Sequence, residues 1–471
     1  MFGRLVRKEL LHHLLDFRFI VVFTLCALLS ALSVYVGGRN YGRRLQEYGE
    51  VSESTRQALQ KTSLSKGRLW DLTWVGIRWH RRPEVLSPVV YGLSGALGQE
   101  VNIKYQQPSE FEASPFETDP TYALFEVLDL AYIVKVCMSL AVLLFTFDAI
   151  CGEKEGGTLR LYASFPVSRS RLALAKLVGC TVAIWAPFVF SFLLVSLALA
   201  ISPGMGLQAA DWGRMIALTG VFGLYLTVFA AFGLWGSALT HRRMTAFLAL
   251  LSLWAVWVFV VPNLAVDIGR RLAPAGSSFD LQKQVGTMHW ETRLNQASEK
   301  RTYYQRNPVK DWSALSTADR QVIQDALSKI ESRWDAEYHA RLGDMQKERR
   351  NRLRRQQRIA VFLMAISPLG AVSYASTDLA RTGFMQQERI EDAVNAYLIS
   401  LSQYVQEKTR MALGRTFEGV DLTDFVWFTY QDNDSLGQCL SRNAFHILNL
   451  ALLAVLGFAG AYVAVLRYDV R

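Results

Sequence analysis

Long apolar stretches alternate with long polar segments along the chain. A helix needs about 17–25 consecutive, mostly apolar residues to cross a bilayer. Five stretches meet this length without an Asp, Glu, Lys or Arg: Phe19–Val36, Val178–Ile201, Met215–Leu239, Thr245–Leu264 and Ala444–Leu466. A sixth, Leu128–Phe147, contains Asp129 near one end and Lys135 further in. The pattern therefore predicts an all-α polytopic membrane protein with six transmembrane helices.

Lysines and arginines in the short flanks orient these spans, because cytoplasmic loops carry an excess of both. Four flanks are basic: Arg4, Arg7, Lys8 and Arg18 before the first span; Lys154, Arg160, Arg169, Arg171 and Lys176 between the second and third; Arg242 and Arg243 between the fourth and fifth; Arg467 and Arg471 after the sixth. The short loop Ser202–Gly213 has neither residue type. We therefore expect both termini in the cytoplasm.

This orientation divides the chain into thirteen predicted segments. They are a cytoplasmic interfacial elbow helix (1–18), the first span (19–36), a first extracytoplasmic insertion (37–127), the second span (128–147), a cytoplasmic coupling helix segment (148–177), the third span (178–201), a short outside loop (202–214), the fourth span (215–239), a cytoplasmic loop (240–244), the fifth span (245–264), a second extracytoplasmic insertion (265–443), the sixth span (444–466) and a cytoplasmic tail (467–471).

Both insertions are predicted to be mostly helical. Residues 316–366 contain no Pro and one Gly, and their apolar residues recur at helical spacing, which indicates one long amphipathic helix. Met385–Leu413 is a second helical run, and the aromatic residues of 425–430 follow it. Ile359–Ser376 is apolar but interrupted by Ser367 and Pro368. We interpret it as an interfacial helix rather than a seventh span, which would place the basic C-terminus outside.

Composition changes this picture little. The chain has 471 residues, of which 51% are hydrophobic, and a net charge of +10. Because the short-loop charges flank apolar segments, a membrane explains them better than nucleic acid, and no nucleic-acid partner is expected. Only Cys439 of the five cysteines falls on the oxidising face, so no disulfide is predicted. The N-terminal apolar run is as long as a span and lacks a cleavage site, so no cleaved signal is expected.

Motifs of self-contained enzymes are missing from the sequence. It has no GxxxxGK[ST] phosphate-binding loop, no HExxH and no GxSxG. The seven histidines are scattered, and His446, inside the sixth span, is interpreted as a packed residue. We expect no catalytic residue, no metal site and no cofactor in this chain.

The stretch directly after the second span, from Asp148 to Arg171, carries the most information. Gly152 is expected to end the membrane helix, and Glu153 and Glu155 favour the positive N-terminal end of a new short helix. Pro166 would end that helix. Arg169, Arg171 and Lys176 would then anchor the chain at the lipid headgroups. The alternative is a cytoplasmic loop without a role.

This stretch resembles the signature of the ABC-2-type transporter permease family, which reads D-x-x-x-G-E-[KR]-E-x-G-T-L-x-x-L followed by P-V-x-R. The matching residues are Asp148, Gly152, Glu153, Lys154, Glu155, Gly157, Thr158, Leu159, Pro166, Val167 and Arg169, with Tyr162 in place of the last Leu of the first block. Arg7–Leu11 is similar to the family's elbow helix. The two large insertions depart from the family's minimal form and resemble a subgroup with large extracytoplasmic insertions.

The resemblance implies a transmembrane permease subunit of an ATP-binding cassette exporter in the bacterial cytoplasmic membrane. It would form a dimer with a second permease, identical or paralogous. Two copies of a separate ATPase subunit would bind ATP and Mg²⁺. The residues implied in ATPase coupling are Glu153, Glu155, Gly157, Thr158, Leu159, Arg160, Tyr162, Phe165, Pro166 and Arg169. The apolar ones would pack in a groove of the ATPase, and the charged ones would set orientation by charge complementarity.

The sequence allows two interpretations of each of three further features. Lys135, with Asp129 near it in sequence, either extends its amine to the lipid headgroups or makes an intramembrane pair or substrate contact. The basic run Lys347–Arg358 is either a solvated helix face or a site for anionic lipid or glycan. The aromatic residues of 425–430 form either a membrane-interface belt or a binding site.

Two further functions remain open beside export. The large insertions allow a mechanical coupler that uses ATPase strokes to remodel an envelope partner without transport. A membrane enzyme is the third class. A transport path needs a cavity between the spans, whereas a coupler needs tightly packed spans and a stiff stalk outside the membrane.

Overall fold

The structure is a computed structural model that describes residues 2–68, 76–96, 98–104, 111–112, 128–157, 169–202, 206–308, 316–411, 420–432 and 434–467. The chain forms two compact units, one of residues 1–262 and 364–471 and the other of residues 263–363. Within the described residues, six helices are long and apolar enough to cross a membrane: Phe17–Leu59, Leu130–Glu155, Leu174–Ile201, Ala209–Leu239, Arg243–Leu272 and Ala444–Arg467. They contain the six predicted spans almost completely, and the all-α polytopic class is confirmed.

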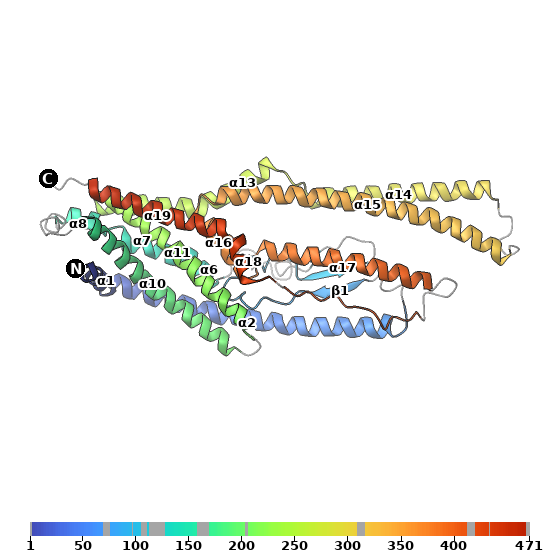
Figure 1. The fold of residues 1–471 in the computed structure, drawn as a ribbon, viewed down its shortest axis with the longest axis horizontal. Helices are drawn as coiled ribbons and strands as arrows, with labels where there is room; N and C mark the ends of the chain where they lie inside the picture. Colours follow the sequence, from blue (N-terminus) through green and yellow to red (C-terminus); the bar gives the residue numbers. More distant parts are fainter. Residues whose placement is uncertain are drawn as a thin grey trace. The chain divides into compact units, whose positions relative to one another are not determined.

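The first unit contains most of the elements (Figure 1). Its helices are α1 (Phe2–Leu14), α2 (Phe17–Leu59), η1 (Gln60–Leu64), α6 (Leu130–Tyr132), η2 (Ile133–Met138), α7 (Ser139–Thr146), α8 (Cys151–Glu155), α10 (Arg169–Ile201), α11 (Ala209–Leu239), α12 (Arg243–Ala255), η3 (Val256–Val260), α16 (Pro368–Leu379), α17 (Phe384–Met411), α18 (Leu436–Arg442) and α19 (Ala444–Arg467). Its strands are β1 (Ile77–His80), β2 (Glu100–Ile103) and β3 (Phe111–Glu112).

Helix α11 is the centre of the span bundle and contacts α7, α10, α16 and α19. Glycines let these helices approach closely, as is common between membrane helices. A Cβ added at Gly460 of α19 would lie 2.5 Å from the indole of Trp235, and one added at Gly233 would lie 2.0 Å from Oγ1 of Thr146. His446 is buried and stacks on Tyr374 at 5.5 Å, as expected for a packed histidine.

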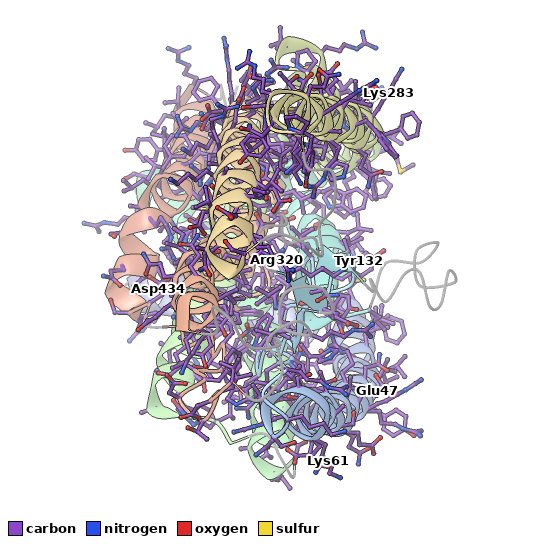
Figure 2. All side chains as sticks on the ribbon, turned by 90° about the vertical axis from the view of Figure 1, so that its right-hand side faces the viewer. Glu47, Lys61, Tyr132, Lys283, Arg320 and Asp434 are labelled. Atoms are coloured by element: carbon purple, nitrogen blue, oxygen red, sulfur yellow. The ribbon has the colours of Figure 1, made fainter. Side chains whose placement is uncertain are left out.

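Helix α2 continues well beyond the length that a bilayer requires, because 43 helical residues extend about 65 Å. Its distal part lies beside β1 (Figure 1). The side chain of Glu47 projects from the surface of α2, and that of Lys61 from η1, which follows it (Figure 2). We call residues 39–112 and 384–432 the lobe. The lobe has its own apolar core, which includes Ile77, Val101, Val394 and Phe428.

Strands in the lobe are a difference from the prediction of mostly helical insertions. β1, β2 and β3 pair antiparallel in this order, with Ile77 opposite Ile103 and Trp79 opposite Val101. Val101 and Ile103 alternate with more exposed residues, which is the period of a half-buried strand. Strands this short give a weak sequence signal, and pairing between residues 10 to 26 positions apart in the chain stabilises them.

The segment predicted as one interfacial helix, Ile359–Ser376, is two elements. The helix that contains Ile359 ends at Met364, and α16 begins at Pro368 after Ser367, whose hydroxyl accepts the Leu369 N–H. Helix α16 is buried against α11 and α19. A single interfacial helix is therefore wrong, because the Ser-Pro pair starts a new helix and protein contacts cover its apolar face.

The second unit is a helical hairpin. After α13 (Val261–Leu272), helices α14 (Ser278–Arg306) and α15 (Thr317–Met364) run side by side (Figure 1). Ion pairs join them, including Lys300 with Glu331 and Arg333 with Glu299. Helix α15 confirms the long helix predicted over 316–366. The basic run at its C-terminal end contains an i,i+4 pair between Arg352 and Glu348.

Replacing Gly233 by Ala should destabilise the bundle, because the new Cβ would overlap the Thr146 side chain, 2.0 Å away at Oγ1. Overpacking of this kind costs about 1–3 kcal/mol. Gly220→Ala is the matched control on the same helix, where an added Cβ meets no atom within 4 Å. Thermal unfolding in detergent should show a lower midpoint for Gly233→Ala only. Equal midpoints for the two variants would contradict the close approach of α7 and α11.

Candidate functional site

The signature stretch begins with a short helix. α7 ends at Thr146, a turn follows, and α8 covers Cys151–Glu155. Gly152 therefore lies within α8 rather than ending the preceding helix. Gly157 has a φ of +71°, a left-handed conformation that ends the helical path. A continuous helix from Glu153 to Pro166 is wrong for this reason.

Part of the predicted coupling set lies outside the described residues: Thr158, Leu159, Arg160, Tyr162, Phe165 and Pro166. Arg169 is the first residue of α10. Glu153, Glu155 and Gly157 are described, and Gly157 is exposed.

Glu153 is paired inside the protein. Its carboxylate lies 2.8 Å from Nζ of Lys176 on α10, and the same ammonium lies 3.5 Å from the carboxylate of Glu9 on α1. Lys176 is 3% exposed. A buried ammonium is stable only when carboxylates replace its hydration, and here two of them do so. Anchoring at the lipid headgroups, predicted for Lys176, is therefore wrong.

Helix α1 packs closely on α10 at this point. A Cβ on Gly179 would lie 2.7 Å from Cβ of Glu9, so only glycine leaves room for the glutamate. Next to it, Nε2 of His13 lies 3.1 Å from Sγ of Cys180. Burial lowers the pKa of His13, although Glu9 acts in the opposite direction. Because the imidazole is neutral at neutral pH, it adds no charge beside Lys176.

The next two residues of the signature contact helix ends. Nζ of Lys154 donates hydrogen bonds to the backbone carbonyls of Ala238 and Thr240, at the C-terminal end of α11. The carboxylate of Glu155 accepts the backbone N–H of Arg243, the first residue of α12, at 2.9 Å. A cation thus lies at a helix C-terminus and an anion at an N-terminus, which are the favourable positions in the helix dipole field.

Asp148 extends the set of contacts to α2, since its carboxylate pairs with Arg18 at 3.0 Å. On the opposite side, the hydroxyl of Ser237 accepts the backbone N–H groups of Ile150 and Cys151, both at 3.0 Å. The stretch Asp148–Glu155 is therefore bonded directly to α2, α10, α11 and α12, and to α1 through Lys176. A displacement of α8 would be transmitted to all five helices. We call Asp148–Glu155 with Lys176 and Glu9 the α8 junction.

Sequence reasoning identified the acidic residues of the α8 junction but missed their partners. It assigned Glu153 and Glu155 to a partner protein, whereas both have intramolecular contacts here. The missed residues are Glu9, Arg18, Lys176, Ser237 and Arg243. One signal was available for Lys176, because it directly precedes an apolar span where an unpaired charge is costly.

Asp129 and Lys135 are not paired with each other in the structure. Asp129 caps α6: its carboxylate accepts the backbone N–H groups of Tyr132 and Tyr91, each at 2.6 Å. Lys135 lies in the π-helix η2, is half-buried, and has no ion pair among the described residues. Its carbonyl accepts the hydroxyls of Ser139 and Tyr225. Substrate contact remains an untested prediction for both.

The aromatic residues of 425–430 belong to the lobe. Phe428 is buried against Trp79 and Tyr397, with ring centroids 5.2 Å apart in both pairs. The guanidinium of Arg56 lies over the Trp427 ring at 5.3 Å. A lipid-facing belt is therefore wrong for Phe428, because protein side chains cover its ring.

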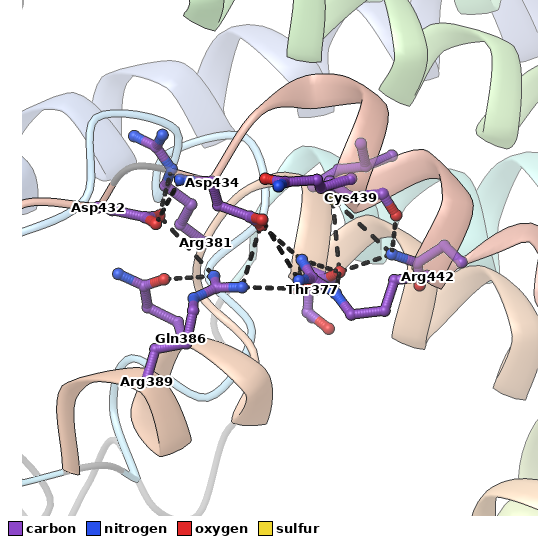
Figure 3. Close-up of polar contacts among 12 residues, drawn as sticks. Thr377, Arg381, Gln386, Arg389, Asp432, Asp434, Cys439 and Arg442 are labelled. Carbon is purple, nitrogen blue, oxygen red and sulfur yellow. Dashed lines mark hydrogen bonds and ion pairs between the residues drawn. The ribbon is translucent and has the colours of Figure 1, made fainter. Parts of the chain in front are cut away.

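A second charged cluster joins the lobe to the spans (Figure 3). The carboxylate of Asp434 accepts hydrogen bonds from Arg389 at 3.0 Å and from Arg442, and Asp378 accepts from Arg442 as well. Arg381 pairs with Asp432 at 2.8 Å. Burial acts to raise the pKa of Asp434, but the hydrogen bond from Arg442 and the charges of Arg389 and Arg442 outweigh it and lower the pKa.

Arg214 connects this cluster to α11. It is 1% exposed and donates to the backbone carbonyls of Leu379 and Asp434, at 3.2 and 2.7 Å. The second turn of α11 is thereby bonded to the end of α16 and to the segment before α18. We call Arg214, Asp378, Arg381, Arg389, Asp432, Asp434 and Arg442 the arginine–aspartate network.

Comparison with known proteins agrees with these features. A family model described as ABC-2 family transporter protein matches residues 4–470. A probable ABC transporter permease protein NosY of Stutzerimonas stutzeri is 31% identical over 137 residues, which cover 28% of this chain and 49% of that protein. The NosY protein of Pseudomonas aeruginosa is 43% identical over 53 residues, covering 11% of this chain and 19% of that protein. The matches thus span half or less of either relative.

Lys176→Met should destabilise the protein, because it removes the buried ammonium between the carboxylates of Glu9 and Glu153. Removing one partner from a buried ionic cluster costs about 3–5 kcal/mol. Lys8→Met is the control, because Lys8 also pairs with Glu9, at 3.7 Å, but its side chain is 48% exposed, and an exposed pair contributes about 0–1 kcal/mol. Thermal unfolding midpoints should separate the two variants. A similar loss in both would show that Lys176 is not the central ion of the α8 junction.

Proposed function

The chain belongs to the ABC-2 family of transporter proteins and is a membrane permease subunit of an ABC transporter, and we propose that it forms an export pathway driven by a separate ATPase subunit. It is a multi-pass protein of the bacterial inner membrane. Permease subunits of this family are not themselves catalytic. ATP and Mg²⁺ would be bound by two copies of the ATPase, and a second permease, identical or paralogous, would complete the membrane part.

The α8 junction is the observation that carries the proposal. Glu153, Lys154 and Glu155 bond α8 to α10, α11 and α12 and, through Lys176, to α1. Gly156 and Gly157 directly after it are exposed. An ATPase that binds the segment beginning here would move the ends of several spans together. The acidic residues of the signature would then transmit force within the permease, while the residues after Gly157 make the contact with the ATPase.

A mechanical coupler is the second candidate, and the α14–α15 hairpin is the observation that favours it. Two antiparallel helices held by ion pairs form a stiff element. Such a stalk suits the transmission of movement to an envelope partner. The two functions share the α8 junction and differ in whether substrate passes between the spans.

Cysteine accessibility tests the proposed orientation. Gly157→Cys should be labelled only by reagents that reach the cytoplasm, whereas Gln60→Cys and Lys329→Cys should be labelled by reagents that cannot cross the inner membrane. All three positions are exposed, and four of the five native cysteines are buried. The parent protein gives the background from half-buried Cys137. Labelling of Lys329→Cys by membrane-permeant reagents only would overturn the proposed topology.

Site-specific photocrosslinking tests the ATPase interface in cells. A photoreactive residue at Gly156 should capture a protein with an ATP-binding cassette, identified by mass spectrometry, because this exposed glycine lies beside the α8 junction. The same residue at exposed Gln60, at the end of α2, is the control and should not capture it. Capture of the ATPase from Gln60, or its absence at Gly156 while the ATPase co-purifies, would place the interface elsewhere.

A further inference from the structure

A cavity of about 570 Å³ lies where the lobe meets the start of α11. Its walls come from α2, β1, the segment 81–85, α17, the segment 427–432 and the first turn of α11. Pockets that bind small molecules usually have volumes of about 300–1,000 Å³. The cavity is therefore large enough for an organic ligand, and the α8 junction contributes nothing to it.

Arginines and aromatic rings dominate the lining. The arginines are Arg56, Arg78, Arg81, Arg82 and Arg381, and the aromatic residues are Tyr48, Trp79, Trp427, Phe428 and Tyr430. Three carboxylates also line the cavity: Glu84, Asp211 and Asp432. Positive side chains thus outnumber negative ones, and flat apolar surfaces lie between them.

The three carboxylates already have partners. Asp432 pairs with Arg381 at 2.8 Å, Asp211 accepts the backbone N–H of Gln208 at 2.9 Å, and Glu84 lies 3.9 Å from Arg81. Burial raises the pKa of Glu84 to about 7, although Arg81 and Arg381 act in the opposite direction. The cavity is therefore poorly suited to a cationic ligand, because two of its three carboxylates already lie beside arginines and the third, Asp211, bonds the start of α11.

Several donors in the cavity have no such partner. Arg56 and Arg82 form no ion pair among the described residues, and Arg56 is oriented by its stacking on Trp427. Nε2 of His80 is buried and has no hydrogen-bond partner within the described part of the chain. A buried polar nitrogen without a partner is costly, and a bound ligand can supply the missing contact.

We propose that this cavity binds a small organic anion whose phosphate or carboxylate group is held by Arg56 and Arg82 and whose body lies against Trp427 and Tyr430. Guanidinium groups bind phosphate and carboxylate with paired, charge-assisted hydrogen bonds. Helix α11 contributes Gln208 and Asp211 to the wall, and the Asp211 carboxylate offsets the positive end of this helix, so the attraction for an anion comes from the arginines.

The bound anion would lie next to the arginine–aspartate network. Arg381 and Asp432 belong both to the cavity wall and to that network, which reaches α11 through Arg214. The site is independent of the proposed ATPase interface, because binding requires only residues of the lobe and of the start of α11. The same chemistry is present in the phosphate of a lipid headgroup and in a soluble organic phosphate.

Calorimetry with phenyl phosphate tests the proposal on the full-length permease in nanodiscs of phosphatidylcholine, without ATPase or ATP. We expect saturable binding with one site per chain and quenching of tryptophan fluorescence. Phenol, which lacks the charge, and inorganic phosphate, which lacks the ring, should each bind at least about tenfold more weakly. Absence of saturable phenyl phosphate binding at millimolar concentration would overturn the proposal and leave the ATPase interface unaffected.

The double variant Arg56→Gln/Arg82→Gln should raise the dissociation constant for phenyl phosphate by at least about tenfold, the effect of losing charge-assisted hydrogen bonds. Both side chains are exposed, so the variant should fold, and an unchanged melting midpoint verifies this. Arg43→Gln, on α2 outside the cavity and 80% exposed, is the matched control and should bind normally. Unchanged affinity in the double variant would overturn the assignment. If the double variant has a lower melting midpoint than the parent, Trp427→Leu is tested instead, and unchanged affinity in that variant would overturn the assignment in the same way.

Nanodiscs that contain phosphatidylglycerol distinguish the two sources of the anion. If the lipid headgroup occupies the cavity, phenyl phosphate should bind more weakly in these discs than in phosphatidylcholine, and the difference should vanish in Arg56→Gln/Arg82→Gln. If affinity is the same in both discs, the ligand is a soluble anion. Each outcome supports an anion site and identifies its source, whereas a lipid effect that persists in the double variant would contradict occupancy of this cavity.

Discussion

The buried ammonium of Lys176 requires carboxylates around it. This requirement holds α1, α8 and α10 together at one end of the span bundle. Glu9 and Glu153 come from distant parts of the chain, one from the N-terminal helix and one from the signature stretch. Neither carboxylate nor ammonium is stable in this place alone. The ionic cluster therefore holds α1, α8 and α10 together, and the neighbouring contacts of Lys154 and Glu155 add the ends of α11 and α12.

The same principle operates at the other end of α11. Arg214 is almost fully buried and donates to backbone carbonyls, while the other three arginines and the three aspartates of the arginine–aspartate network pair with one another. Helix α11 thus has a charged junction at each end and an apolar, glycine-assisted interface along its length. A rigid helix fixed in this way is suited to carry movement between the α8 junction and the lobe.

The contacts of the α8 junction give the family signature a structural explanation in this chain. The described signature residues from Asp148 to Glu155 are bonded to other helices of the same chain, which places them between these helices and the segment that follows Gly157. The lobe, formed by parts of both insertions, adds a basic and aromatic cavity beside α11. The permease therefore combines the membrane scaffold of its family with a lobe whose cavity is lined by arginines and aromatic rings.

Local patterns in the sequence determined the six spans, the long helix of 316–366 and the signature stretch, because hydrophobic length and helical periodicity involve residues close along the chain. They did not determine the partners of Glu153, the burial of α16, the pairing of β1 with β2 or the cavity between 77–85 and 427–432. Each of these joins segments that are about twenty or more residues apart, and the cavity joins segments more than three hundred residues apart. Composition and spacing do not indicate which buried charged residues pair with each other. Only the tertiary structure decided which helices α8 contacts and where the arginines of the lobe lie close together.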